Sequence, residues 1–200
     1  MNYNGPKVKI SRKLGVEVTP KSGKYTAKKN YPPGQHGNSK RRHKQSDYGR
    51  QLLEKQRLRY QYNITEKQMR NYYKKATQIT GNTGDILVQL LESRLDALVF
   101  RSGLARSIYG ARQYVSHGHI FVNGKKVNIS SYKVQPNDVF EVKAKSRKLD
   151  CFQEAIRSAA PPDYLDLSKA EFKAKYLYIP PREEIPVVCD VPLVVEYYSR

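Results

Sequence analysis

The sequence contains no tryptophan, only two cysteines, few acids in its first third and no long apolar run. Cys151 and Cys189 are not spaced as a C-x-x-C pair, which argues against a disulfide framework or a cysteine metal site and for a reducing compartment. No apolar run approaches the ~20 residues that a membrane-spanning helix needs. The N-terminal segment also lacks the apolar core of a secretory signal. We therefore expect neither a secreted nor a membrane-spanning protein.

Positive charge dominates what is present, and it is unevenly distributed. The 200-residue chain has a formal charge of +19, and residues 1–75 contain 20 lysines and arginines against 4 acids. Residues 92–148 contain 11 against 4, whereas residues 149–200 contain 6 against 9. A concentrated excess of this size indicates a polyanionic partner, and nucleic acid is the usual one.

The first 45 residues are expected to be irregular. They combine many cations with frequent proline and glycine, including the turn sequence YPPGQHG at residues 31–37, and have few aliphatic side chains. Such a segment buries too little apolar surface to fold alone. We predict a basic arm that is mobile in the free protein and becomes ordered on its partner.

Two helices are predicted between residues 46 and 80. Ser46 is a suitable N-cap for the first. Thr65, with Gln68 three residues later, has the spacing of a capping box for the second. Both helices have a narrow apolar side and a broad cationic side.

The most apolar helical pattern begins at Asp85 and continues until Gly103, where a glycine can end a helix in the left-handed conformation. Ser107 is the expected N-cap of the next helix, which ends at Gly118. The alternating run that follows is interrupted by Asn123-Gly124, the strongest short signal for a β-hairpin.

The remaining chain is expected to begin with a third strand, VFEVK at residues 139–143, and a short helix, CFQEAIRSA at residues 151–159. Proline-rich joints after this helix indicate loops. The last apolar run, PLVVEYYSR, is β-prone, and we expect it to pack back on an earlier element.

Several of these segments together resemble a known family. Residues 92–142 are similar to the small RNA-binding fold named after ribosomal small-subunit protein S-four, often described by its αL motif. The segments YPPGQHG, SDYGRQLLEKQ, HGHIFVNGKKVNI and VVEYYSR extend the resemblance along the whole chain, in its bacterial or organellar form.

The resemblance implies an α+β fold in which a helical domain and an αL RNA-binding domain, with helices packed on a small antiparallel sheet, follow an extended basic arm. The implied boundaries are residues 1–42 for the arm and 43–91 for the helical domain, completed by about 181–200. The αL-type domain, with the following helix and loops, takes residues 92–180, and its core module takes 92–155.

The resemblance also implies a function. The family is a structural component of the small ribosomal subunit that binds ribosomal RNA at a multi-helix junction, nucleates assembly of the subunit body and contributes to translational accuracy beside the path of incoming messenger RNA. The implied partners are this RNA and neighbouring small-subunit proteins, especially protein number five, with messenger RNA as a further candidate. No membrane, small-molecule substrate or cofactor is implied. The expected location is the bacterial cytoplasm, bound to ribosomes, with an organelle interior left open.

Three groups of side chains are predicted to contact RNA, because arginine suits bidentate phosphate contacts and lysine suits point-charge contacts. A solvated charged face is the alternative for any single residue. The predicted residues of the αL module are Arg106, Arg112, Gln113, His117, Lys125 and Lys126. Those of the helical domain are Arg50, Lys55, Arg57, Arg59, Arg70 and Lys74. Those of the arm are Lys7, Lys9, Arg12, Lys13, Lys40, Arg41, Arg42, His43 and Lys44.

No catalytic or metal-binding residue is predicted. Some family members hold zinc with four cysteines in the arm, but the positions of the first pair look like Val8 and Ser11 here, and neither binds zinc as a thiolate does. The tripeptide RLD at residues 94–96 is similar to a catalytic tripeptide of pseudouridine synthases, although a local pair between Arg94 and Asp96 is the simpler interpretation. A fragment of an RNA-modifying or tRNA-charging enzyme and a free regulatory RNA binder remain the alternatives.

Overall fold

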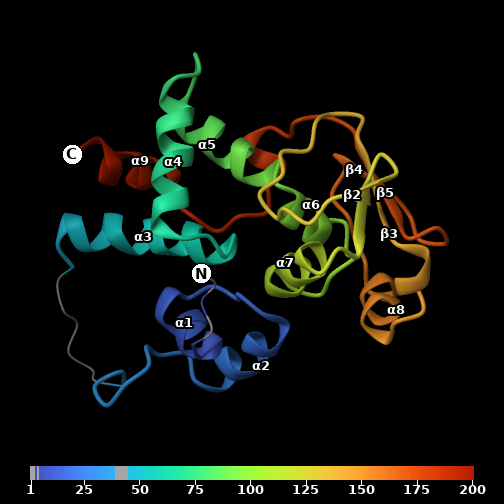
Figure 1. The fold of residues 1–200 in the computed structure, drawn as a ribbon. Helices are drawn as coiled ribbons and strands as arrows, with labels where there is room; N and C mark the ends of the chain where they lie inside the picture. The colour runs from blue at the N-terminus through green and yellow to red at the C-terminus, as the bar shows by residue number, and fades with distance from the viewer. Residues whose placement is uncertain (1–2, 4, 39–44) are drawn as a thin grey trace. The chain divides into compact units, whose positions relative to one another are not determined.

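A computed structural model describes residues 3, 5–38 and 45–200 of the chain (Figure 1). The chain divides into two compact units. Unit 1 contains the described part of residues 1–87 together with residues 187–200, and unit 2 contains residues 88–186. Among the described helices, none combines the length and the apolar composition needed to cross a membrane. The α+β fold class is confirmed.

Two helices occupy the N-terminal segment, α1 (Lys7–Leu14) and α2 (Pro20–Lys28), so the expectation of an irregular arm is wrong for this part. The Ser11 hydroxyl donates to the Ser22 hydroxyl at 2.9 Å, and the Val18 backbone N–H donates to Ser11 Oγ at 3.2 Å. Both serines are fully buried. This contact between α1 and α2 is polar, so a count of aliphatic residues could not reveal it. Ordering of the arm on RNA stays a prediction.

Unit 1 also contains α3 (Asp47–Gln61), α4 (Glu66–Thr77) and α9 (Val191–Ser199). Both predicted caps are confirmed: Ser46 Oγ accepts from the Gly49 N–H at 3.2 Å, and Thr65 forms a capping box with Gln68. These bonds satisfy backbone N–H groups that a helix start leaves without partners. The two helices therefore begin where the sequence predicts.

The C-terminal run forms the helix α9, so the expectation of a β-prone segment is wrong, whereas its packing on earlier elements is confirmed. A proline occupies the first turn of α9, a position where its fixed φ favours a helix. Val191 and Val194, three residues apart, are buried. The helix lies beside α3 and α4 (Figure 1). The Tyr198 hydroxyl donates to Glu66 Oε1 at 2.7 Å, which joins α9 to α4.

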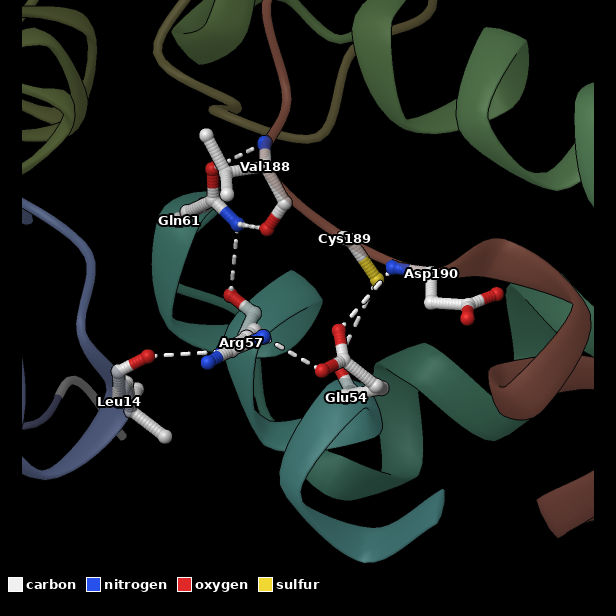
Figure 2. Close-up of polar contacts among 7 residues, drawn as sticks. All are labelled: Leu14, Glu54, Arg57, Gln61, Val188, Cys189 and Asp190. Carbon is white, nitrogen blue, oxygen red and sulfur yellow. Dashed lines mark hydrogen bonds and ion pairs between the residues drawn. The ribbon is translucent and has the colours of Figure 1, made fainter. Parts of the chain in front are cut away.

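One face of α3 also holds the N-terminal segment (Figure 2). Arg57 Nε donates to the Leu14 carbonyl at 2.7 Å, and its Nη1 donates to Glu54 Oε1 at 2.5 Å. Since Leu14 is the last residue of α1, its carbonyl has no partner within the helix ladder. Arg57 therefore caps α1 while its own charge is matched by Glu54.

The same face of α3 holds the segment that leads into α9 (Figure 2). Glu54 Oε2 accepts from the Asp190 N–H at 3.0 Å. Gln61 donates to the Val188 carbonyl at 3.0 Å and accepts from the Val188 N–H at 3.2 Å. Glu54, Arg57 and Gln61 repeat at helical spacing, so they lie on one face of α3. From this face they bind both the end of α1 and the segment that leads into α9.

The predicted apolar helix from Asp85 to Gly103 is two helices, α5 (Thr83–Glu92) and α6 (Leu95–Arg101). Arg94 separates them with an extended backbone, ψ 143°, and pairs with Lys133 as an isolated β-bridge. The Leu95 N–H then donates to the Tyr132 carbonyl at 2.9 Å. A contact from a distant loop therefore interrupts a pattern that is continuous in the sequence.

The next helix, α7 (Ile108–Ser116), follows the prediction closely. Gly103 and Gly118 adopt positive φ values of 79° and 71°, and Ser107 Oγ accepts from the Gly110 N–H at 3.2 Å. The predicted hairpin joins β1 (Ile120–Val122) to β2 (Lys125–Lys126), with positive φ at Asn123 and Gly124. Both predictions are confirmed.

The described chain contains one antiparallel sheet in the order β2-β1-β3-β5-β4. Its third strand, β3 (Val139–Val142), and the helix α8 (Asp150–Arg157) were predicted. The strands β4 (Leu165–Ser168) and β5 (Lys173–Tyr176) lie where loops were expected. Short 3₁₀ helices occur at Ala144–Ser146 and Arg182–Glu184. The core of unit 2 lies between one face of the sheet and helices α6, α7 and α8, and includes Leu98, Val115, Ile120, Val122, Phe140, Phe152 and Tyr176.

Candidate nucleic-acid interface

The α7 region presents three of its predicted contact residues to solvent. Gln113 and His117 are exposed near the end of α7. Arg106, in the loop before α7, forms an ion pair with Glu154 at 2.7 Å, and both side chains are 58% exposed. Exposed pairs contribute little free energy, so Glu154 can release Arg106 to a phosphate at small cost.

Arg112 occupies a different environment. Its side chain is only 13% exposed, and its Nη1 lies 3.8 Å from Asp96 Oδ2. Asp96 is itself fully buried and accepts two hydrogen bonds from Arg94, which confirms the local pair expected within RLD. Arg112 therefore completes an interior charge cluster, and we leave it out of the proposed surface.

The two lysines of β2 are both exposed but lie on opposite faces of the sheet. Lys125 pairs with Val122, whose side chain is in the core, whereas Lys126 pairs with Phe121 on the other face. Side chains alternate between faces along a strand, so one flat RNA surface cannot contact both lysines equally. The sequence alone predicts both lysines as RNA contacts and does not distinguish their faces.

Lys126 lies against the end of α7. A side-chain carbon added at Gly118 would lie 2.3 Å from Lys126 Cε, so the lysine chain passes directly over this glycine. His117 precedes Gly118, and its ring centroid lies 6.1 Å from that of His119. Lys126 therefore covers Gly118, the residue that follows His117, at one corner of unit 2.

His119 and Lys143 extend this cationic corner and were not predicted. Burial lowers the pKa of His119, and the nearby His117 and Lys143 lower it further. The Lys143 N–H donates to the His119 carbonyl at 2.8 Å, which fixes the two residues side by side. The signal was present in the sequence, since His119 directly precedes one predicted strand and Lys143 ends another with which it could pair. We define the α7 corner as His117, His119, Lys126 and Lys143.

The six cations predicted in the helical domain divide into exposed and internal groups. Arg50, Arg70 and Lys74 are exposed, and the last two lie one helical turn apart on α4. Lys55 is buried and donates to Glu66 at 2.8 Å. Arg59 Nη1 lies 3.9 Å from the same carboxylate. With Arg57 also bound within the protein, these three buried or half-buried cations support the fold, and we leave them out of the proposed surface.

The arm shows the same division. Lys9 and Lys13 are exposed one turn apart on α1, and Lys7 is half-buried. Arg12 donates to the carbonyls of Lys29 and Tyr31 at 3.2 and 2.9 Å, so it holds the turn that starts YPPGQHG. The remaining predicted contacts lie outside the described residues; they are Lys40, Arg41, Arg42, His43 and Lys44.

Among the described residues, no group of three or more histidine, cysteine or acidic side chains is arranged to hold a metal ion. Val8 and Ser11, where the family's first cysteine pair would lie, are both on α1, and Ser11 is already bonded to Ser22. Their side chains are a hydrocarbon and an alcohol, which do not fit a thiolate zinc centre.

Comparisons with known proteins identify the family. Residues 2–92 match the family described as "Ribosomal protein S4/S9 N-terminal domain", and residues 93–140 match the "S4 domain". The chain is 49% identical over 201 residues to "Small ribosomal subunit protein uS4" of Chlorobium limicola, which covers 99% of this chain and 98% of the relative. It is 48% identical over 204 residues to the protein of the same name from Streptomyces avermitilis, which covers 100% and 99%. Similarity at this level along both whole lengths shows that the chain belongs to the uS4 family of small ribosomal subunit proteins.

Proposed function

We propose that this chain binds small-subunit ribosomal RNA at a multi-helix junction and, by binding early, nucleates assembly of the subunit body. Its family consists of structural ribosomal proteins, which are not enzymes. The observation that carries the proposal is the α7 corner, where four cationic or titratable side chains are held together by the fold. Lys126 and Lys143 supply the fixed positive charge of this corner, and a phosphate that binds beside them is attracted by it.

Recognition of shape suits this surface. Folded RNA hides its base edges in a deep major groove, and proteins contact its phosphates and 2′-hydroxyl groups instead. The α7 corner is rigid because Val115, Ile120 and Val142 beneath it are buried. Unit 1 supplies its own exposed cations on α1 and α4, so each unit can engage RNA separately and together they bind more tightly.

We propose further partners at a finer level. Ribosomal protein number five is a candidate neighbour for the α3–α9 surface, where Tyr48 is 50% exposed and lies 5.8 Å from the Tyr197 ring. Exposed tyrosines of this kind are enriched in protein interfaces. By family resemblance, the protein would also lie beside incoming messenger RNA, affect translational accuracy and reside in the cytoplasm on ribosomes.

The decisive experiment is the salt dependence of binding to an RNA fragment that contains the junction. If about 8 phosphates are neutralised, log affinity should fall against log salt with a slope of about −6 to −7. Lys126→Gln and Lys74→Gln should each reduce the slope by roughly one. Lys169→Gln changes an exposed lysine in the acidic segment 149–200 and should leave the slope unchanged. A slope shallower than about −2 would contradict the proposal.

A further inference from the structure

His119 is held in a fixed orientation within the α7 corner. Its ring nitrogen Nδ1 lies 2.9 Å from the hydroxyl oxygen of Ser146, so the two groups share a hydrogen bond. The ring also packs edge-on against Tyr114 and Phe152, with centroids 6.4 and 6.1 Å away. Tyr114 stays uncharged, since burial and a hydrogen bond with Cys151 raise its pKa to about 12. One hydrogen bond and two aromatic neighbours therefore fix the imidazole.

The second ring nitrogen of His119 is available to a ligand. Among the described residues, no group forms a hydrogen bond with Nε2, and Nε2 is not one of the buried atoms that lack a partner. The neighbouring His117 is exposed, and its ring centroid lies 6.1 Å from that of His119. Nε2 is therefore the nitrogen from which His119 can bond a phosphate at the α7 corner.

The surroundings of His119 favour the neutral ring in the free protein. Burial lowers the pKa of His119, and the charges of His117 and Lys143 lower it further. Lys126 covers Gly118, between the two histidines, and adds a fixed positive charge. Because its pKa lies below the ordinary 6.5, His119 is mostly uncharged at pH 7.

Ser146 allows His119 to change its charge without losing the hydrogen bond between them. A serine hydroxyl can donate or accept, whereas a protonated imidazole donates from both of its nitrogens. When Nδ1 of the neutral ring carries the lone pair, the hydroxyl donates to it. When the ring is protonated, Nδ1–H donates to Ser146 Oγ instead, and Nε2–H needs an acceptor outside the protein. The same geometry therefore fits both states of the ring.

A phosphate is the acceptor that suits the protonated ring. Its negative charge favours the imidazolium, in opposition to burial and to the charges of His117 and Lys143. A hydrogen bond between an imidazolium and a phosphate oxygen is charge-assisted and roughly twice as strong as a neutral one. Lysine side chains such as Lys126 can contact the same anion as point charges. An uncharged ligand would not offset the two positive neighbours.

We propose that RNA binding at the α7 corner takes up one proton from solvent onto His119. The proton adds to the ring nitrogen that carries the lone pair. The resulting imidazolium donates from Nδ1 to Ser146 and from Nε2 to one phosphate oxygen. No covalent bond to RNA forms, and dissociation returns the proton to solvent. The inference rests on the proposed function, because the phosphate belongs to the RNA that the exposed cations hold.

This proton uptake fixes the sign of the pH dependence. His119 has a lower pKa in the free protein than in the complex, so between these two values the complex binds the additional proton. Affinity for RNA therefore rises as the pH falls through this window. Below the pKa of the free protein, both states are protonated and the gain levels off. Acid effects on Glu66 lie outside the window, since its pKa is below 4.5.

The test measures the affinity of the full chain for the junction RNA fragment between about pH 8 and about pH 6, at constant ionic strength. The wild type should bind about tenfold more tightly at the lower pH, the gain expected when one pKa rises by about one or more. His119→Gln should reduce this gain to about threefold or less. His36→Gln changes an exposed histidine of the arm and should keep the full gain. Protonation of RNA bases would appear in every variant, so a tenfold gain that survives in His119→Gln would overturn the proposal.

NMR titration of the histidine rings gives a second measurement that needs no variant. The pKa of His119 should rise from below 6.5 in the free protein to above it in the complex, and that of His36 should not change. An unchanged His119 pKa would overturn the proposal. A steep salt slope with no pH dependence would refute the proton uptake and leave the RNA-binding function intact. A salt slope shallower than about −2 would instead refute that function.

Discussion

Arg94 and Asp96 are joined by two hydrogen bonds in the interior of unit 2, with Nε–Oδ1 at 2.9 Å and Nη2–Oδ2 at 2.6 Å. Their side chains are 1% and 0% exposed. Asp96→Ala should leave a buried guanidinium without its partner and lower the free energy of unfolding by about 3–5 kcal/mol, measured by urea denaturation. Asp166→Ala, at an exposed position, should change it by less than about 0.5 kcal/mol. A loss below about 1 kcal/mol for Asp96→Ala would show that water or another group compensates the guanidinium.

Glu66 should make unit 1 sensitive to acid. Burial raises the pKa of Glu66, but the hydrogen bonds from Lys55 and Tyr198 and the charge of Arg59 together lower it by more, so its pKa lies below the ordinary 4.5. The folded state therefore binds this proton less readily than the unfolded state does. The stabilisation is present above pH 4.5 and is lost as the pH falls through the lower, folded-state pKa.

Urea midpoints for the wild type and Glu66→Gln, measured from pH 7 to pH 3, test this linkage. The variant should be less stable at pH 7 and should lose less stability in acid. Glu171→Gln, which changes an exposed acid in unit 2, serves as the control. Parallel curves for the wild type and Glu66→Gln would refute the prediction.

Arg57 should control the order of the N-terminal helices. Arg57→Met removes the donor that caps α1 at Leu14 and leaves Glu54 without its cation. Hydrogen bonds made by charged groups are worth about 1.5–3 kcal/mol, so α1 amides should exchange roughly ten- to a hundredfold faster. Hydrogen exchange of the whole protein gives the measurement, and unit 2 should be unaffected. Arg70→Met, on the exposed face of α4, should leave α1 protection unchanged; equal protection in both variants would rule out the capping role.

Phe140 and Phe121 provide a matched pair on neighbouring strands. Phe140 is fully buried in the core of unit 2, whereas Phe121 lies on the opposite face of the sheet and is only partly buried. Phe140→Ala should cost about 3–5 kcal/mol through lost burial and a cavity, and Phe121→Ala clearly less. Chemical denaturation of both variants checks the difference. Similar losses would mean that the outer face of the sheet is packed as tightly as the core.

Zinc should not contribute to stability. The resemblance places Val8 and Ser11 where some family members have cysteines, so we expect chelator treatment to leave the melting temperature and RNA affinity unchanged. Elemental analysis should find less than one zinc per chain. Stoichiometric zinc that survives dialysis would reveal a different ligand set.

Local signals predicted the helix starts and the hairpin well, because each depends on a few adjacent residues. Ser46, Thr65 and Ser107 cap helices through side chains that bond three residues ahead, and Asn123-Gly124 adopts the positive φ values that a tight turn requires. The resemblance to a family added what these signals cannot give, namely the RNA partner.

Long-range contacts explain the errors. The break at Arg94 depends on Lys133, and β5 is a strand because it pairs with β3 and β4. Positive charge in the sequence also did not distinguish exposed cations from those that bind acidic side chains within the protein. Lys55 looks like the exposed Arg50 in the sequence, yet Glu66, eleven residues away, holds it in the interior. No local pattern reports whether a cation already has a partner inside the fold.

The sheet order has a consequence for synthesis of the chain. Strand β3 acquires β1 at once, but its other neighbour, β5, follows only after α8 and β4. Until then β3 is an open edge that carries the apolar side chains of Phe140 and Val142. Edges of this kind can pair with other nascent chains. Slow folding of residues 143–176 would therefore prolong the exposure of an edge that other chains can join.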